Sequence, residues 1–268
     1  MLQNKLGFIF LLVMTFLISC KKGEKDNTGC ICVPIPAQND TYIYPIRPGD
    51  SEWKSLSDGY QRVEACQVPE HLLKVMSTTG LVETCISHPL LAELIFSDLP
   101  SGGLQKAIEK QISMFNCFGE LLKRSDAGKC LLARYLSMSP CCVENSQIDV
   151  GKFANSYSEF EMIFSQANFL EQLSPDELLY LIRKALVTYK EKVEYDKYYS
   201  WMYGMNTTAF LMARSMVWFH YKPFILEIEK NYYLKRFVNT SALPENNEDF
   251  KNLFEVIENN ADDLLKNK

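Results

Sequence analysis

Two cysteines and two histidines in the first third of the chain have a spacing that suits zinc. Cys66 and His71 precede Cys85 and His88 in the pattern C-x4-H…C-x2-H, and zinc accepts two thiolates with two imidazoles. Cys66 and His71 share a helix face poorly unless a helix begins between them, at Pro69. A Cys66–Cys85 disulfide and two buried thiols with surface histidines are the alternatives. Both are favoured over zinc, so we predict neither a metal nor a cofactor.

Carboxylate pairs are the next candidates for chemistry. Glu159 with Glu161, and Glu191 with Glu194, could perform the acid and base steps of glycoside hydrolysis. At these spacings in helices, such acids are usually solvated faces. The residues 126–129 resemble a phosphate loop only superficially, because the first glycine and the Ser/Thr are missing. No serine or cysteine lies in a nucleophile elbow, so we predict no catalytic residue. The sequence favours a protein that is not an enzyme.

An aromatic run in the second half of the chain is the best candidate for binding. Aromatic rings bind sugar faces and protein partners, and tyrosine adds a polar tip. The alternative is that these rings belong to the core and its rim. The candidate binding residues are Tyr195, Tyr198, Tyr199, Trp201 and Tyr203.

Helical patterns position these residues from about residue 61 to the C-terminus. Ser174, Pro175 and Glu177 form the strongest signal, because serine caps, proline fits the first turn and the glutamate completes a capping box. Apolar residues recur every three or four positions between Leu104 and Leu122, which predicts one amphipathic helix. A last helix is expected between about Pro244 and Leu265.

The segment 209–219 is apolar on nearly every face, which is typical of a central helix. It contains Arg214, for which we predict an ion pair with a carboxylate of another helix. The one short candidate for a strand is 41–44. The predicted fold class is therefore all-α, a single domain of about eight helices in a bundle or in stacked helical hairpins.

The N-terminus resembles a bacterial lipoprotein signal. Lys5 precedes the apolar run 8–18, which is too short to remain across a membrane, and Leu-Ile-Ser-Cys then ends at Cys20. This resemblance implies cleavage after residue 19, lipidation of the Cys20 sulfur, including palmitate-type acyl chains, and lasting membrane attachment. The expected organisation is a signal peptide over 1–19, a lipidated, extended tether over 20–60 and a helical domain over 61–268.

Charge and cysteine content limit the remaining possibilities. The chain has 28 Lys and Arg against 33 Asp and Glu, for a net charge of −5. This balance argues against a nucleic-acid partner, which needs a basic face. Beyond Cys20, eight of the nine cysteines remain. Export makes disulfides plausible, but spacing alone does not pair these cysteines.

A series of short motifs covers about a third of the chain, from Tyr44 to about Tyr135. They are Tyr44-Pro45-Ile46, Pro48, Glu52-Trp53, Ala65-Cys66-Gln67-Val68-Pro69-Glu70, Leu81-Val82-Glu83-Thr84-Cys85, Pro89-Leu90, Phe115-Asn116, Glu120-Leu121-Leu122, Arg124 and Asp126-Ala127-Gly128. This stretch resembles a family of uncharacterised lipoproteins from the Bacteroides group, in which a glycine is usual at the position of Cys117. The resemblance implies a bacterial lipoprotein and assigns no activity.

Three functions therefore compete. The sequence favours a non-enzymatic protein-interaction or scaffold module, anchored to the membrane through Cys20. A glycan- or nutrient-binding accessory lipoprotein is the alternative, and an open cleft lined by the aromatics would favour it. A hydrolase with a dispersed site comes third, and carboxylates with a raised pKa would favour that function. Lys21 after the lipidated cysteine generally permits transport to the outer membrane. Whether the domain faces the periplasm or the exterior stays open.

Overall fold

The computed structural model describes residues 30, 32, 40–91, 103–144 and 149–268. Helices make up most of this part of the chain and no strand occurs in it, which confirms the all-α class; 41–44 is irregular. This part of the chain contains 14 α-helices, more than the predicted number of about eight, because several are only one or two turns long. The elements are α1 (Ser51–Ser55), α2 (Gly59–Ala65), α3 (Glu70–Leu73), α4 (Thr78–Ile86), α6 (Leu104–Met114), α7 (Asn116–Leu121), α8 (Ala127–Leu136), the 3₁₀ helix η2 (Pro140–Glu144), α9 (Val150–Phe164), α10 (Ala167–Leu170), α11 (Pro175–Glu194), the π-helical turn η3 (Trp201–Met205), α12 (Asn206–Trp218), α13 (Lys222–Lys230), α14 (Tyr232–Thr240) and α15 (Asn247–Lys266).

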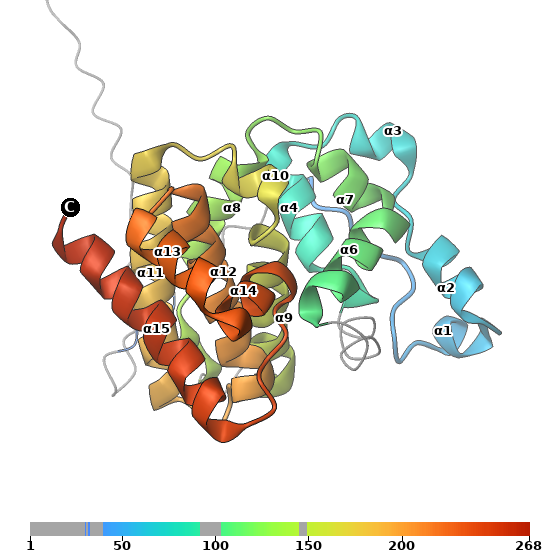
Figure 1. Cartoon of the computed structure of the whole chain (residues 1–268). Coiled ribbons are helices and arrows are strands. Elements are labelled where there is room, and N and C mark those ends of the chain that lie inside the picture. Colours follow the sequence, from blue (N-terminus) through green and yellow to red (C-terminus); the bar gives the residue numbers. More distant parts are fainter. Residues whose placement is uncertain (1–29, 31, 33–39, 92–102, 145–148) are drawn as a thin grey trace, which may run out of the picture.

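Helix α12 lies at the centre of the C-terminal part of the molecule (Figure 1). It packs against α9, α11, α13, α14 and α15. Its residues from Asn206 to Ala213 are all buried. The apolar pattern predicted an enclosed helix over 209–219, which is confirmed for its first half, whereas Val217, Trp218 and Phe219 are half-buried. This arrangement holds α11 and α15 on adjoining sides of α12, where they also contact one another.

Arg214 in α12 does not form the predicted ion pair. Its Nη1 donates a hydrogen bond to the Gln105 side-chain oxygen at 3.0 Å. The guanidinium also lies 5.3 Å from the centre of the Phe210 ring, one turn earlier. Burial lowers the pKa of Arg214, and the nearby carboxylate of Glu109 opposes that shift. The hydrogen-bond partner of Arg214 is therefore the neutral amide of Gln105, and the Glu109 carboxylate acts on Arg214 only through its charge.

Helices α4, α6, α7 and α8 form a second group beside α9 (Figure 1). The predicted single helix from Leu104 to Leu122 is in fact α6 and α7, which are separated at Phe115, where the backbone is extended. Asn116 causes the break, because its side chain bonds both backbone groups of Val68, at 3.0 and 2.7 Å. Both helix groups share one continuous apolar core.

Residues 40–60 belong to the folded body, although the sequence predicts a tether up to residue 60. Tyr44 and Trp53 are 2% and 5% exposed and lie in the core. The Tyr44 hydroxyl donates to the Thr84 carbonyl oxygen at 3.3 Å, and α1 and α2 begin before residue 61. The prolines prevent long helices in this segment, but they do not prevent the segment from packing against the helical body.

Two disulfides connect the N-terminal segment to η2. Cys30 bonds Cys141 and Cys32 bonds Cys142, closing loops of more than one hundred residues. Loops of this length give the largest entropic stabilisation in the chain-entropy account of disulfides. Cys30 and Cys32 are therefore fixed to the helical body.

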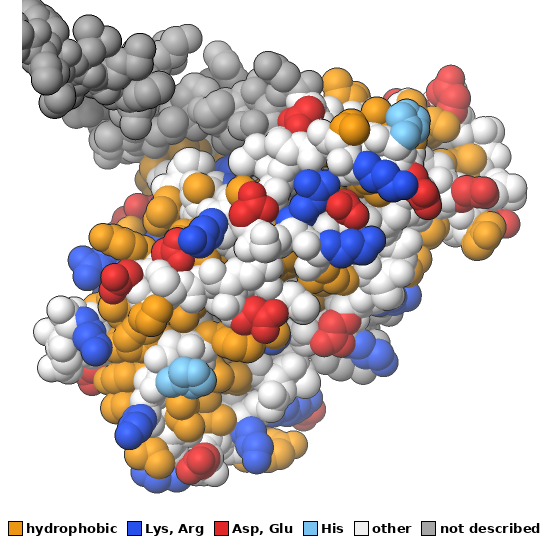
Figure 2. Space-filling view, turned by 90° about the horizontal axis from the view of Figure 1, so that it is seen from above, with side chains coloured by type: hydrophobic (Ala, Val, Ile, Leu, Met, Phe, Trp, Pro, Cys, Tyr) orange, Lys and Arg blue, Asp and Glu red, His pale blue; other side chains and the backbone are white. Residues whose placement is uncertain are grey.

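The molecular surface carries both signs of charge. On the face shown in Figure 2, basic and acidic side chains are interspersed and no basic stripe is formed. Within the described ranges, no helix has the length and apolar character needed to cross a bilayer. Cys20 and the signal segment 1–19 lie outside those ranges.

Candidate functional site

An aromatic groove lies where α11, η3 and α15 meet. Its volume is about 630 Å³, a size that suits a small ligand or an inserted side chain. Four rings and Val193 supply the apolar part of the lining, and the rim is polar. The lining residues are Tyr189, Val193, Trp201, Asn247, Phe250, Lys251, Phe254, Glu255 and Glu258.

The rings of the groove support one another. Phe254 lies 5.4 Å from the Trp201 ring, edge to face, and 6.1 Å from Tyr189 in a stacked arrangement. Phe250 contacts both Trp201 and Phe254. Tyr189 and Phe254 are almost fully buried, whereas Trp201 is 40% exposed. The groove therefore offers one accessible indole on a rigid aromatic floor.

The rim of the groove is acidic. Lys190 forms ion pairs with Glu258 at 3.5 Å and with Asp262 at 3.2 Å. Helix α15 carries six acids against two lysines over its length, in the sequence NEDFKNLFEVIENNADDLLK. Of these acids, Glu255 and Glu258 line the groove, where Lys251 and the ion pair of Lys190 with Glu258 offset part of their charge. The remaining acidic surplus lies along α15 outside the lining.

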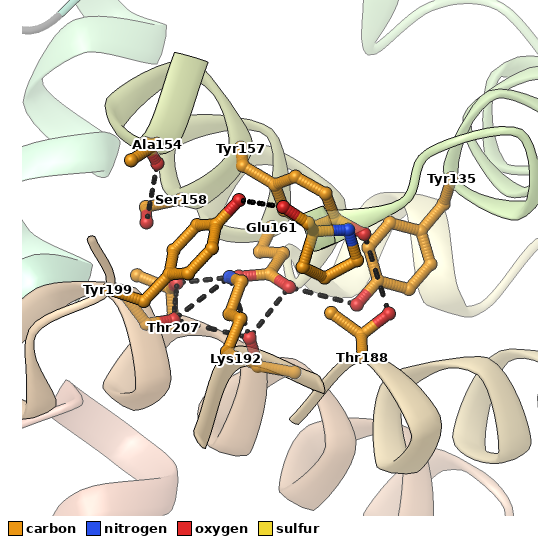
Figure 3. A network of polar contacts seen from close by, with 12 residues as sticks. Tyr135, Ala154, Tyr157, Ser158, Glu161, Thr188, Lys192, Tyr199 and Thr207 are labelled. Atoms are coloured by element: carbon orange, nitrogen blue, oxygen red, sulfur yellow. Dashed lines mark hydrogen bonds and ion pairs between the residues drawn. The ribbon is translucent and has the colours of Figure 1, made fainter. Parts of the chain in front are cut away.

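A buried ion pair fixes the turn that presents Trp201. Lys192 of α11 and Glu161 of α9 lie 2.7 Å apart and neither is exposed. The Lys192 ammonium also donates to the Gly204 carbonyl in η3 at 2.9 Å and to the Thr208 hydroxyl in α12 at 2.9 Å (Figure 3). The charge of Lys192 thus joins three elements behind the groove.

Glu161 is equally well satisfied. One carboxylate oxygen accepts from Lys192 and Thr207, and the other accepts from Thr208 and the Tyr135 hydroxyl, at 2.6 to 2.9 Å. Tyr157 places its ring 4.4 Å from the Lys192 nitrogen. Burial lowers the pKa of Lys192, and the Glu161 charge opposes that shift. Because this network is closed to solvent and fully bonded, its role is to hold structure.

The turn η3 depends on Gly204. A Cβ at this position would lie 2.9 Å from Tyr199 Cβ, closer than real side chains approach. The π-helical turn buries Tyr203 and Met205 while leaving Trp201 half-exposed. Such turns insert one extra residue and redirect side chains. The backbone of η3 therefore places the Tyr203 ring in the core and the Trp201 ring in the groove.

The aromatic run predicted as a binding surface is divided by the structure. Only Trp201 of the five candidates lines the groove. Tyr199 and Tyr203 are 1% and 7% exposed and belong to the core. Tyr195 and Tyr198 are half-buried and pack against it. Tyr199 and Tyr203 therefore correct the prediction, because both rings are enclosed in the core, whereas Tyr195 and Tyr198 lie outside the groove.

Sequence reasoning missed the contribution of α15. Phe250 and Phe254 lie on the predicted last helix and form the wall of the groove. Their i, i+4 spacing signals one helix face. No local signal indicates that this face crosses α11 beside Trp201.

A second cleft, of about 550 Å³, contains Glu159 of α9. The Glu159 Oε1 atom is buried and has no hydrogen-bond partner within the described structure. Burial raises the pKa of Glu159 to about 8, so the side chain carries a proton at neutral pH. Glu83, which also lines this cleft, forms a 2.7 Å ion pair with Arg134. A protonated acid and an ionised acid therefore share one cleft.

The predicted carboxylate pairs do not act as pairs. Glu159 lines the cleft, whereas Glu161 points into the buried network. Glu191 is half-buried, and this burial raises its pKa, whereas Glu194 is exposed. Neither pair converges on a common point.

The cysteine and histidine set assembles neither a zinc site nor a disulfide. Cys66 and Cys85 are buried and are not joined by a disulfide, as in the alternative of two buried thiols. His71 is exposed, whereas His88 is buried against the Phe115 ring at 3.9 Å. Burial lowers the pKa of His88 to about 3, so it is neutral. Among the described residues, one set of possible ligand atoms lies close enough together to hold a metal ion. It is formed by the sulfurs of Cys30, Cys32 and Cys142.

Comparison of the chain with protein-family models, with curated proteins and with solved structures finds no match in any of the three. The groove at α11 and α15 and the cleft at Glu159 must therefore be interpreted from their own geometry.

Proposed function

We propose that this protein is a non-enzymatic binding module, anchored to a bacterial outer membrane by a lipid on Cys20, whose aromatic groove receives an apolar side chain of a protein partner. The observation that carries this proposal is Trp201, which is 40% exposed above a floor of buried rings. Tryptophan at the centre of a preformed pocket is the residue most often found to dominate protein binding.

The surroundings of the groove favour a protein over a sugar. Val193, which lines the groove beside Trp201, is 38% exposed. Aliphatic surface of this kind gains from burial against another apolar side chain, whereas a sugar would use mainly the polar rim at Asn247 and Glu255. The exposed Val193 side chain therefore supports an occupant with an apolar side chain.

The acids at the rim define the partner further. Because α15 is strongly acidic, a segment with basic residues on either side of its apolar anchor is complementary. The expected partner segment has a leucine or aromatic anchor flanked by lysine or arginine. Its attraction to the rim should weaken as salt screens the charges.

The test is calorimetric titration of the full chain in detergent with a lysine-flanked Phe-Leu peptide. Binding of this peptide should be at least about tenfold tighter than that of the same peptide with glutamates, a difference of about 1.4 kcal/mol. Trp201→Ala should weaken binding by about 2 kcal/mol or more. Tyr180→Ala, which removes a 60% exposed ring elsewhere on α11, is the matched control and should leave affinity unchanged. Equal affinities for both peptides would reject the proposal, and binding of oligosaccharides alone would favour the glycan alternative.

A second candidate function is hydrolysis in the Glu159 cleft. The unpartnered, buried carboxyl with a pKa of about 8 has the protonation state of a general acid at neutral pH. Glu83 in the same cleft is paired with Arg134 and could serve as the ionised partner.

Assays with a panel of chromogenic glycosides test this second function. An activity that falls above about pH 8 and disappears in Glu159→Gln would establish it. Activity that survives Glu159→Gln would place the chemistry elsewhere.

A further inference from the structure

Two disulfides lie side by side where Cys30 and Cys32 contact η2. The Cys30 and Cys32 sulfurs lie 3.6 Å apart, and the Cys30 and Cys142 sulfurs 4.0 Å apart. The sulfurs of Cys30, Cys32 and Cys142 all lie within 4.8 Å of one another. Cys141, bonded to Cys30 with a Cα–Cα distance of 5.9 Å, completes the cluster. We call these four residues the cysteine cluster.

These separations match a metal–thiolate centre. Zinc–sulfur bonds of about 2.3 Å in a tetrahedron place the sulfurs about 3.8 Å apart. The two measured distances between non-bonded sulfurs lie on either side of that value. The sulfurs of Cys30, Cys32 and Cys142 are therefore already held close to the spacing that zinc requires. Cys141, whose sulfur is bonded to that of Cys30, adjoins these three and becomes the fourth ligand by rotation of its side chain after reduction.

The surroundings also suit such a centre. Cys30, Cys141 and Cys142 are each less than one-tenth exposed, and Cys32 is half-buried, which leaves an entry path. The side chains of Phe153 and Tyr195 cover the cluster on its inner side. Ser139 Oγ lies 3.1 Å from the Cys141 sulfur and can donate a hydrogen bond to a thiolate there.

We propose that the cysteine cluster is a redox-gated zinc site, with two disulfides in its oxidised state and a four-thiolate Zn²⁺ centre in its reduced state. Each disulfide accepts two electrons and two protons from a dithiol reductant, which itself becomes a disulfide. Zn²⁺ then replaces the four thiol protons, which are released to solvent. In both states the cluster fixes Cys30 and Cys32 to η2. With four protein ligands the zinc is closed and structural.

Cobalt titration of the reduced full chain tests this site. After phosphine reduction under anaerobic conditions, one Co²⁺ per chain should give the intense visible bands of a tetrahedral thiolate complex, and Zn²⁺ should remove them. The oxidised chain should give none. Cys32→Ser should abolish the bands. Cys130→Ser, which removes a half-buried thiol outside the cluster, is the matched control and should retain them.

A second measurement needs no variant. In the reduced wild-type chain, Zn²⁺ but not Mg²⁺ should protect the four cluster cysteines from alkylation, as read by mass spectrometry of peptides. Cys130 should react in either case. Absence of the cobalt bands in the reduced wild type, their persistence in Cys32→Ser, or alkylation of all four cysteines in the presence of Zn²⁺ would each overturn the proposal. Protection of Cys66, Cys85 and Cys117 in place of the cluster would also overturn it, because the metal would then bind the other thiols.

Discussion

Lys192 and Glu161 are ion-paired without access to solvent, so the charge of each depends on the other. Their remaining hydrogen-bonding capacity is met by hydroxyls and by the Gly204 carbonyl. A buried pair of this kind contributes little net stability compared with apolar residues, but the loss of one partner is costly. The pair therefore specifies how α9, α11 and η3 meet.

Glu161→Leu should destabilise the fold by about 3–5 kcal/mol, because it leaves the Lys192 charge buried without a partner. Adding Lys192→Met should recover much of that loss. Urea denaturation of the two single variants and the double variant measures the coupling. Strictly additive effects would show that the two side chains do not depend on one another.

Glu159 makes stability depend on pH. Its pKa rises from 4.5 to about 8 in the folded protein, so the folded state holds a proton that the unfolded state releases. Its contribution to stability is therefore progressively lost as pH rises from about 4.5 to about 8. Glu159→Gln should gain stability relative to the wild type across this window, on the order of a few kcal/mol at most.

Urea melts of the wild type and of Glu159→Gln across that pH window measure the difference. The control is Glu229→Gln, which changes an exposed acid on α13. Parallel stability curves for the wild type and Glu159→Gln would mean that the Glu159 carboxyl is solvated.

The sequence identified these acids but could not assign their environments. Glu159 and Glu161 are two residues apart on one helix, yet one lines a cleft and the other is enclosed. The partners of Glu161 are contributed by α8, α11 and α12, which are distant in sequence. Local pattern carries no information about such contacts.

Local signals predicted the start of α11 and, less closely, that of the last helix. The Ser174–Glu177 capping box is present as expected, and α15 begins at Asn247, with Asn246 as its cap, after the predicted start near Pro244. The break between α6 and α7 and the turn η3 were not predicted. Both are held by long-range bonds, from Asn116 to Val68 and from Lys192 to Gly204.

Asn116→Ala should destabilise the protein by about 2 kcal/mol or more, because both backbone groups of Val68 lose their partners. The matched control is Asn239→Ala, where an exposed amide bonds only its own helix. The shift in the denaturation midpoint measures both. A negligible shift for Asn116→Ala would mean that water replaces these bonds without cost.

For the chain as a whole, the predicted all-α fold class is confirmed, whereas the predicted start of the folded domain at residue 61 is wrong. Apolar periodicity correctly indicated an all-α protein with a central helix at α12. The folded body nevertheless begins before residue 61, because Tyr44 and Trp53 insert into the core. Proline-rich segments lack a periodic pattern, so their docking cannot be read from the sequence.

Membrane attachment is a prediction from the sequence and rests on Cys20. Cys20→Ala should prevent lipidation and release the protein from washed membranes, because the signal segment alone is too short to anchor it. Fractionation with labelled palmitate measures this. A Cys20→Ala protein that remains lipidated and membrane-bound would contradict the assignment.

The most direct test of the proposed function is site-specific photocrosslinking in native membranes. A photoreactive residue at Val193, which lines the groove, should capture one protein whose contact segment has an apolar anchor flanked by basic residues. Trp201→Ala should abolish that capture, and the same probe at Tyr180, outside the groove, should not capture it. Identical products from positions 193 and 180, or capture that persists in Trp201→Ala, would contradict the account.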